Sequence, residues 1–189
     1  MRTFNLITML LFMSQLSFGQ VKYAAKDNIN MSVSGTSTMH DWEMKTSTGS
    51  CDATFTTDDA GNFTGLTRMT YKTTAKSLKS GKDGMDKNAY KALKADQNPE
   101  ISAVLKSSEI TQKGEGNYTI NSKIDLTIGG KTLETDLVTQ AKTKGNSVTI
   151  TGEKKINMKD YDLSPPSFML GTVKTGKDVV LKFNLTLSN

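Results

Sequence analysis

Residues 118–141 form two alternating segments joined at Gly129-Gly130, and this stretch constrains the fold more than any other. In the first segment, apolar Ile124, Leu126 and Ile128 share one parity and polar residues take the other, which predicts a strand with one solvated face. The glycine pair is typical of a tight hairpin that needs positive φ angles. At about 3.3 Å per residue, such a strand extends about 35 Å, which suits the wall of a barrel.

Short alternating segments bounded by turn residues recur along the rest of the chain and predict an antiparallel meander. After a short lead, a first strand is expected over residues 29–33, followed by one extended stretch over 36–44. Gly152 is expected to be a bend or bulge, and the prolines in 164–170 predict a loop that presents Phe168 and Met169. The other strands are expected over residues 51–55, 66–75, 100–107, 147–158 and 179–187.

One segment departs from this pattern. Over residues 83–97, Met85, Ala89 and Leu93 recur at helical spacing, which predicts a single amphipathic helix. Asp83 is expected to be its N-cap, and Asn98, before a proline, its end. A helix inserted in a meander either lids the barrel or covers an outer face of the sheet, and the sequence leaves both open. The prediction is an all-β fold with one short helical insertion: an antiparallel barrel of about eight strands.

Residues 1–19 have the features of a secretory signal peptide, with Arg2 near the start, an apolar run and cleavage expected before Gln20. Residues 20–189 are then expected to form one exported domain, periplasmic or secreted. Because the residue directly after the cleavage point is Gln20 and not Cys, no stable membrane anchor of the lipoprotein kind is expected. Cys51 is the only cysteine, so no intramolecular disulfide can form, and a small buried hydrophobe is the favoured reading.

Charge and chemistry point away from several classes of function. The net charge is +5. Among the lysines of residues 76–94, Tyr90 is the only aromatic residue, whereas a nucleic-acid surface needs several aromatic side chains to stack on bases. We interpret them as a solvated helix face, with contact to an anionic surface as the alternative. One His and one Cys are too few for a metal site, and no motif selects a catalytic residue. His40 either accepts a hydrogen bond from a ligand head group at the barrel mouth, oriented by the Asp41 carboxylate, or ties a strand to a loop.

Several pieces of the sequence resemble the YceI-like family of exported, lipocalin-like barrels associated with polyisoprenoid binding. They are residues 35–42 (GTSTMHDW), Ser77-Leu78 with Met85-Asp86, 98–101 (NPEI), 126–133 (LTIGGKTL) and 168–171 (FMLG). The pieces occur in the family's order and cover essentially all of residues 20–189. The HDW triplet replaces a differently spaced histidine and aromatic pattern of better-known members.

The resemblance implies a lipocalin-like barrel that holds a long apolar isoprenoid or quinone-like lipid as a carrier or buffer, with no cofactor. A ligand-free stress-response or protein-interaction module is the alternative, and an enzyme acting on a lipid is a third, disfavoured class. The sequence leaves open whether the protein is a monomer or a homodimer. The alternation along the expected strands selects the side chains that would face the barrel interior. On this basis the expected ligand-binding residues are Met69, Tyr71, Ile101, Ala103, Leu105, Ile124, Leu126, Leu137, Ile150, Phe168 and Phe183, together with His40.

Overall fold

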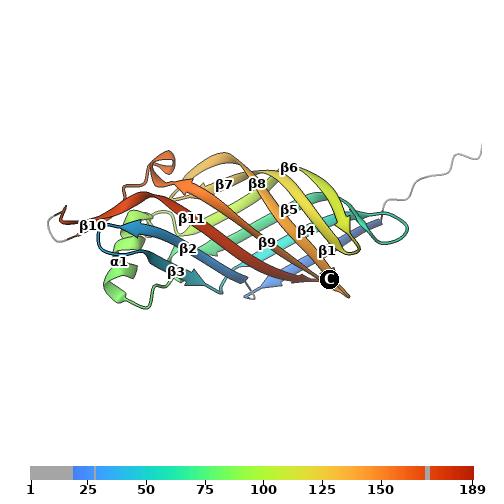
Figure 1. Ribbon diagram of the computed structural model, residues 1–189, viewed down its shortest axis with the longest axis horizontal. Coiled ribbons are helices and arrows are strands. Elements are labelled where there is room, and N and C mark those ends of the chain that lie inside the picture. Colours follow the sequence, from blue (N-terminus) through green and yellow to red (C-terminus); the bar gives the residue numbers. More distant parts are fainter. Residues whose placement is uncertain (1–18, 28, 169–170) are drawn as a thin grey trace, which may run out of the picture.

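Antiparallel pairing closes eight strands of the described chain into a ring, in the order β1-β4-β5-β6-β7-β8-β9-β11, with β11 returning to β1 (Figure 1). The structure is a computed structural model and describes residues 19–27, 29–168 and 171–189. The predicted signal peptide therefore lies almost wholly outside the described residues. The ring strands are β1 (Gly19–Lys26), β4 (Ser50–Thr57), β5 (Phe63–Thr74), β6 (Glu100–Gly114), β7 (Asn117–Ile128), β8 (Lys131–Lys144), β9 (Ser147–Asn157) and β11 (Val173–Ser188).

Outside the ring, the described residues add three further strands and three helical segments. The hairpin of β2 and β3 pairs with β11 through β2, and β10 pairs with the start of β11. The prediction of a barrel of about eight strands is confirmed, because the ring has eight strands and the others lie outside it. These elements are β2 (Ile29–Ser37), β3 (Trp42–Thr46), β10 (Ser167–Phe168), α1 (Asp83–Ala92) and the 3-10 turns η1 (Ala75–Ser77) and η2 (Met158–Tyr161).

The central hairpin is confirmed in position and parity. β7 and β8 pair from end to end, and Ile128 opposes Lys131 across a two-residue turn. Gly129 and Gly130 both have positive φ, +58° and +86°, and a Cβ on Gly129 would lie 2.6 Å from Leu163 Cδ2. The turn therefore needs glycine both for its backbone conformation and for the space that Leu163 takes. Val138, which breaks the alternation of β8, points outward and is 55% exposed.

The first part of the chain differs from the prediction. The expected short lead is β1, which pairs with β4, so one strand was missed. The expected extended stretch over 36–44 is wrong, because the chain reverses between Ser37 and Trp42 to form the β2–β3 hairpin. The Ser37 hydroxyl stabilises this turn by accepting from the amides of Met39 and His40, each at 3.2 Å.

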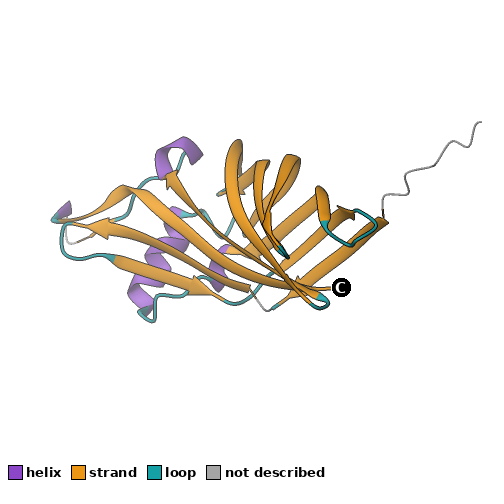
Figure 2. Cartoon of the chain, turned by 45° about the vertical axis from the view of Figure 1, so that its right-hand side comes forward, coloured by secondary structure: helices purple, strands orange, loops and turns teal. Residues whose placement is uncertain are grey.

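The helix is shorter than predicted. α1 ends at Ala92 rather than at Asn98, because Lys94 takes a left-handed φ of +52° and the Ala95 amide donates to the Tyr90 carbonyl at 2.9 Å. Its N-cap is Lys82 instead of Asp83, and no side chain caps that end. Figure 2 shows α1 against the strands at the end of the barrel away from the C-terminus.

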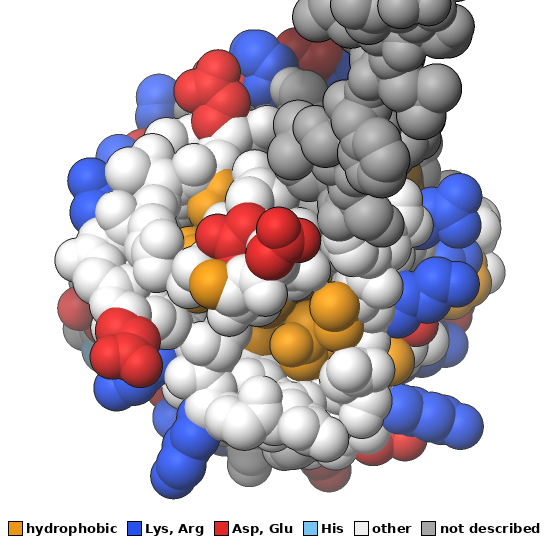
Figure 3. Space-filling view, turned by 90° about the vertical axis from the view of Figure 1, so that its right-hand side faces the viewer, with side chains coloured by type: hydrophobic (Ala, Val, Ile, Leu, Met, Phe, Trp, Pro, Cys, Tyr) orange, Lys and Arg blue, Asp and Glu red, His pale blue; other side chains and the backbone are white. Residues whose placement is uncertain are grey.

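Four aromatic rings close the opposite end of the barrel. Phe55 stacks on Phe63 with ring centroids 4.1 Å apart, and Tyr23 meets both rings edge-on. Tyr118 packs against Phe63 at 5.1 Å and accepts a hydrogen bond from its amide. We call these four residues the aromatic plug. Figure 3 looks onto this end, where hydrophobic side chains show in a recess among polar atoms.

Candidate functional site: an apolar cavity inside the barrel

The inward-facing side chains of the ring enclose a cavity of about 450 Å³. Its wall is built from alternate residues of the long strands, because each strand turns every second side chain toward the barrel axis. The aromatic plug does not contribute to this wall. Beyond the plug, the side chains stop filling the barrel, and most of the residues that line the remaining space are Ile, Leu, Val, Met or Ala. The barrel is therefore hollow.

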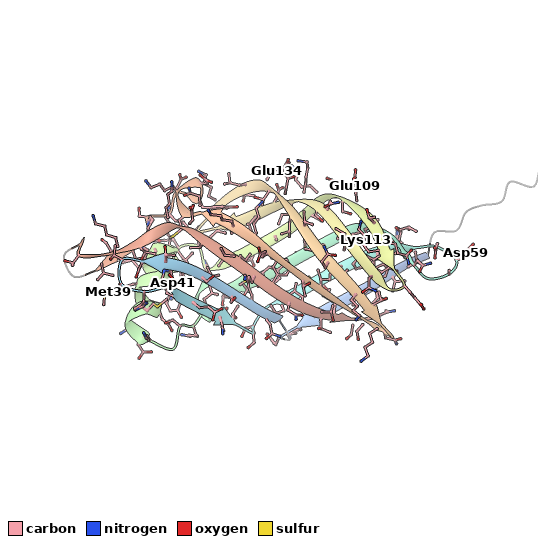
Figure 4. All side chains as sticks on the ribbon, in the orientation of Figure 1. Met39, Asp41, Asp59, Glu109, Lys113 and Glu134 are labelled. Atoms are coloured by element: carbon pink, nitrogen blue, oxygen red, sulfur yellow. The ribbon has the colours of Figure 1, made fainter. Side chains whose placement is uncertain are left out.

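The cavity reaches the end of the barrel that carries α1. Met85, Ala89 and Leu93 of the helix region face the cavity, so α1 lids the barrel rather than covering an outer face of the sheet. The β2–β3 turn forms the other side of this mouth and presents Met39, whose side chain is 67% exposed. Figure 4 shows Met39 and Asp41 at this end and Asp59 at the opposite one.

A buried carboxylate holds the lid in place. Asp86 is 5% exposed, and its Oδ1 accepts hydrogen bonds from the hydroxyl of Ser80 at 2.6 Å and from the Ser80 amide at 2.8 Å. The Ser80 hydroxyl lowers the pKa of Asp86 below its usual value. Farther along α1, the Tyr90 hydroxyl donates to the Leu78 carbonyl at 2.7 Å. Both contacts fasten the helix to residues 78–80, which precede it.

Replacing Asp86 with Ala should loosen the lid and lower the free energy of unfolding by about 1–3 kcal/mol, because the half-buried hydroxyl and amide of Ser80 lose charge-assisted hydrogen bonds. Since folding lowers this pKa, the carboxylate stabilises the fold fully above about pH 4 and loses its effect as the pH falls further. Amide hydrogen exchange of residues 83–92 and urea unfolding measure both effects. The exposed Asp83, changed to Ala, is the matched control and should cost no more than about 1 kcal/mol. Equal losses in the two variants would contradict the role of Asp86.

His40 stands at the mouth, with its ring close to the backbone. Its Nδ1 lies 2.8 Å from the backbone carbonyl of Asp41, so the prediction that the Asp41 carboxylate orients the ring is wrong. The ring is exposed and borders the cavity. Trp42 donates from Nε1 to the Thr36 carbonyl at 3.1 Å, and its indole lies over Gly35, where a Cβ would come within 2.5 Å of it. These contacts give residues 35–42 a structural role in building the mouth.

The structure brings most of the sequence-predicted ligand-binding residues together around one cavity. Leu105 does not line the cavity; it stands beside a β-bulge, where β5 and β6 stop pairing. The side chain of Phe168 lies outside the described part of the structure. The predicted residues that line the cavity are His40, Met69, Tyr71, Ile101, Ala103, Ile124, Leu126, Leu137, Ile150 and Phe183.

Several lining residues were missed from the sequence. Met31, Val33 and Met44 come from β2 and β3, whose hairpin was not foreseen, although the alternation of residues 29–33 is a signal that could have placed the first two. Ser122 and Thr139 also face the cavity, and both are more than nine-tenths buried. Polar residues at inward positions carry no apolar signal, so the periodicity did not select them.

Two acidic groups in the deeper wall stay neutral at neutral pH. Burial raises the pKa of the Cys51 thiol to about 12 and the pKa of the Tyr71 phenol to about 12, so both stay protonated. The Tyr71 hydroxyl donates to the Met31 sulfur at 3.4 Å. A protonated, buried thiol is a poor nucleophile. Most of the wall is apolar, so the cavity is suited to a mostly apolar occupant.

Two further properties concern the described residues alone. Within residues 19–27, 29–168 and 171–189, no three His, Cys, Asp or Glu side chains come together as a metal site. None of the helices in this part of the chain has the length and apolar character needed to cross a bilayer.

Solved structures of other proteins share the fold. Burkholderia cenocepacia BcnA matches with a TM-score of 0.66 at 18% identity, over 84% of this chain and 95% of that one. A polyisoprenoid-binding domain from Saccharophagus degradans, implicated in plant cell wall breakdown, matches with a TM-score of 0.63 at 10% identity, over 88% and 97%. The Campylobacter jejuni YCEI protein matches with a TM-score of 0.54 at 12% identity, over 74% and 81%.

Sequence comparison extends the match to the family level. No curated protein matches the chain significantly. The sequence profile of the YceI-like domain matches residues 20–187, which is nearly the whole chain and agrees with the resemblance of the motifs in residues 35–42 and 126–133. The chain therefore belongs to the YceI-like domain family.

Proposed function

We propose that this protein binds one long apolar chain, an isoprenoid or quinone-like lipid, inside the barrel and acts outside the cytoplasm as its carrier or buffer. The observation that carries the proposal is the hollow interior: a cavity of about 450 Å³ with a mostly apolar inner wall that reaches one end of the barrel. An ordinary core of this size would be filled with side chains. A space of this kind is suited to an apolar ligand.

The energetics favour a chain of several units. Burying one isoprene unit removes about 100 Å² from water and contributes about 2.5 kcal/mol at 25 cal/mol per Å². Association costs about 4–15 kcal/mol in lost freedom. A few units therefore offset this cost, and each further unit adds affinity until the cavity is full.

Two other observations support the proposal. The related Saccharophagus domain is described as polyisoprenoid-binding, and its barrel shares this fold. The features of residues 1–19 favour export, which would place the protein where long apolar lipids need a partner to cross water. A binding protein rather than an enzyme fits the mostly apolar inner wall.

The test is native mass spectrometry, with organic extraction, on protein exported and purified from a cell envelope. We expect a stoichiometric apolar adduct that extraction identifies as an isoprenoid or quinone. Delipidated protein should then take up a polyprenol or quinone added from detergent. Protein that carries no adduct and takes up neither compound would overturn the carrier function and favour an interaction module.

A further inference from the structure

Three lysines point away from the barrel on the outer side of the lid. Ala89 of α1 lines the cavity, and Lys87 and Lys91 are each two residues from it, which is about 200° around the helix. Both are exposed, and so is Lys94, two residues beyond the end of α1. We call Lys87, Lys91 and Lys94 the lid lysines. Because α1 lies at the open end of the barrel (Figure 2), they form a basic stripe on the outside of that end.

The fold does not neutralise this stripe. Among the described residues, the lid lysines form no ion pair, whereas Lys76 pairs with Asp96 at 2.7 Å and Lys79 with Asp86 at 3.8 Å. Like charges three or four residues apart on a helix repel each other and weaken it. The stripe therefore lowers the stability of α1, and a negatively charged surface would relieve the repulsion.

The lid lysines and Lys76 border one recess on this outer surface, which Asp96 also lines. The Tyr90 ring in the recess is held in place: its hydroxyl donates to the Leu78 carbonyl at 2.7 Å, and the Lys79 ammonium stands over the ring, 5.2 Å from its centroid. The ring is therefore not free to stack on a base, as a nucleic-acid surface would require. Lysine ammonium groups bind phosphate as point charges, so the recess suits a phosphate group.

The two ends of the barrel differ in charge. Residues 76–96, which contain the lid, hold six lysines and three aspartates, a net charge of +3. The turns at the plug end, residues 58–62, 113–117 and 142–147, hold three lysines, two aspartates and one glutamate, a net charge of zero. Figure 3 shows both acidic and basic side chains around that end. An anionic surface therefore attracts this protein with its lid end foremost.

The basic stripe lies next to the opening of the cavity. Lys82, at the N-cap of α1, borders the cavity, and so does Asn88, the neighbour of Lys87 in the chain. On the other side of the mouth, Met39 is 67% exposed, with the acidic Asp41 nearby (Figure 4). Lysines beside an exposed apolar side chain are typical of surfaces that bind at a membrane interface, where the lysines meet phosphate groups and the apolar side chain enters the boundary.

Resting on the proposed function, we propose that the mouth end docks on an anionic lipid bilayer, with the lid lysines on lipid phosphate groups and Met39 at the bilayer surface. The opening then faces the membrane, so an apolar cargo passes between bilayer and cavity with little exposure to water. Flexible ammonium groups along a helix suit a fluid layer of phosphates better than the fixed shape of an acidic protein, which is the alternative partner.

The experiment measures the binding of exported, delipidated protein to vesicles of equal parts phosphatidylglycerol and phosphatidylcholine, and to vesicles of phosphatidylcholine alone. The wild type is compared with the triple variant Lys87→Gln, Lys91→Gln and Lys94→Gln. The matched control is the triple variant Lys113→Gln, Lys142→Gln and Lys144→Gln, which removes the same charge from exposed lysines at the plug end.

We expect the wild type to bind the mixed vesicles and not the neutral ones. Each lysine near an anionic surface contributes a factor of about five, so the lid variant should lose at least about tenfold in affinity and the control less than about threefold. Raising the salt from about 0.1 M to about 1 M should release the wild type, because the Debye length falls from about 10 Å to about 3 Å.

The orientation has its own readout. Trp42 is the only tryptophan of the chain and borders the cavity at the mouth. Energy transfer from Trp42 to a dansyl-labelled lipid in the mixed vesicles should therefore rise when the wild type docks. A protein docked by its plug end would hold the indole about 35 Å farther from the lipid, the length of a barrel strand, and would give little transfer.

Equal binding to the two kinds of vesicle, equal losses in the two triple variants, or binding without energy transfer would each overturn the docking. Uptake of a polyprenol from detergent, measured on the same preparations, tests the proposed function separately, and both triple variants should retain it. Uptake without vesicle binding would overturn the docking alone and favour an acidic protein as the partner of the stripe. Vesicle binding without uptake would overturn the carrier function and leave the docking surface in place.

Discussion

An Ala103→Trp variant should fold normally and lose lipid uptake by at least about tenfold, which corresponds to about 1.4 kcal/mol of binding free energy. Ala103 is the smallest side chain in a row across three strands, between Tyr71 and Leu126, and all three residues line the cavity. The indole would enter space that contains no protein atoms, so it removes room for the ligand without removing contacts from the fold. Uptake of a polyprenol or quinone, followed by native mass spectrometry, measures the loss.

The matched control is Val104→Trp. Val104 follows Ala103 on β6, but its side chain points outward and is 44% exposed. This variant should take up lipid as the wild type does, and both variants should retain the circular dichroism and cooperative melting of a folded barrel. Full uptake by the Ala103 variant would show that the ligand does not occupy the cavity.

Replacing Phe55 with Ala should lower the free energy of unfolding by about 3–5 kcal/mol, the usual cost of deleting a fully buried aromatic ring. Phe55 has no exposed surface, stacks on Phe63 and meets Tyr23 edge-on, so its loss leaves a cavity in the aromatic plug. For a domain of this size, the melting temperature should fall by about 6–20 °C. Urea unfolding gives the free energy directly.

The control for this variant is Val138→Ala, which removes apolar atoms from an exposed side chain and should change stability by no more than about 0.5 kcal/mol. Because Phe55 does not line the cavity, its Ala variant should still take up lipid below its melting temperature. Equal losses of stability in the two variants would contradict a closed, packed plug. The pair of Ala103 and Phe55 variants thus separates binding from stability.

Alternation along the longer strands was enough to predict the barrel and much of its inner wall. It works for Ile124 and Leu126 because a β-strand turns every second side chain to the same face, whatever its partners are. It fails for Leu105, where the bulge at Lys106 and the end of the β5–β6 pairing change the course of the strand. Because the bulge at Lys106 contains no glycine, the sequence gives no signal that would predict it.

Features that depend on distant partners were also missed. The adjacent Ala24 and Ala25 blur the alternation of β1, which is defined by its pairing with β4. Gly152 is not a bulge, because the β9–β11 register runs through it without a shift; it leaves room for the ring of Phe183, whose Cζ would lie 2.7 Å from a Cβ there. The early end of α1 depends on the left-handed backbone conformation of Lys94. Glycine or asparagine usually takes this conformation after a helix, so a lysine does not predict the helix end.

The aromatic plug has a kinetic consequence for a carrier of this design. Because one end is sealed, a bound lipid leaves by the opening through which it entered. The barrel therefore cannot pass a lipid from one of its ends to the other. A donor and an acceptor must use the same opening in turn. Transfer then follows double-displacement kinetics: the protein departs from the donor before it meets the acceptor, and excess donor slows delivery.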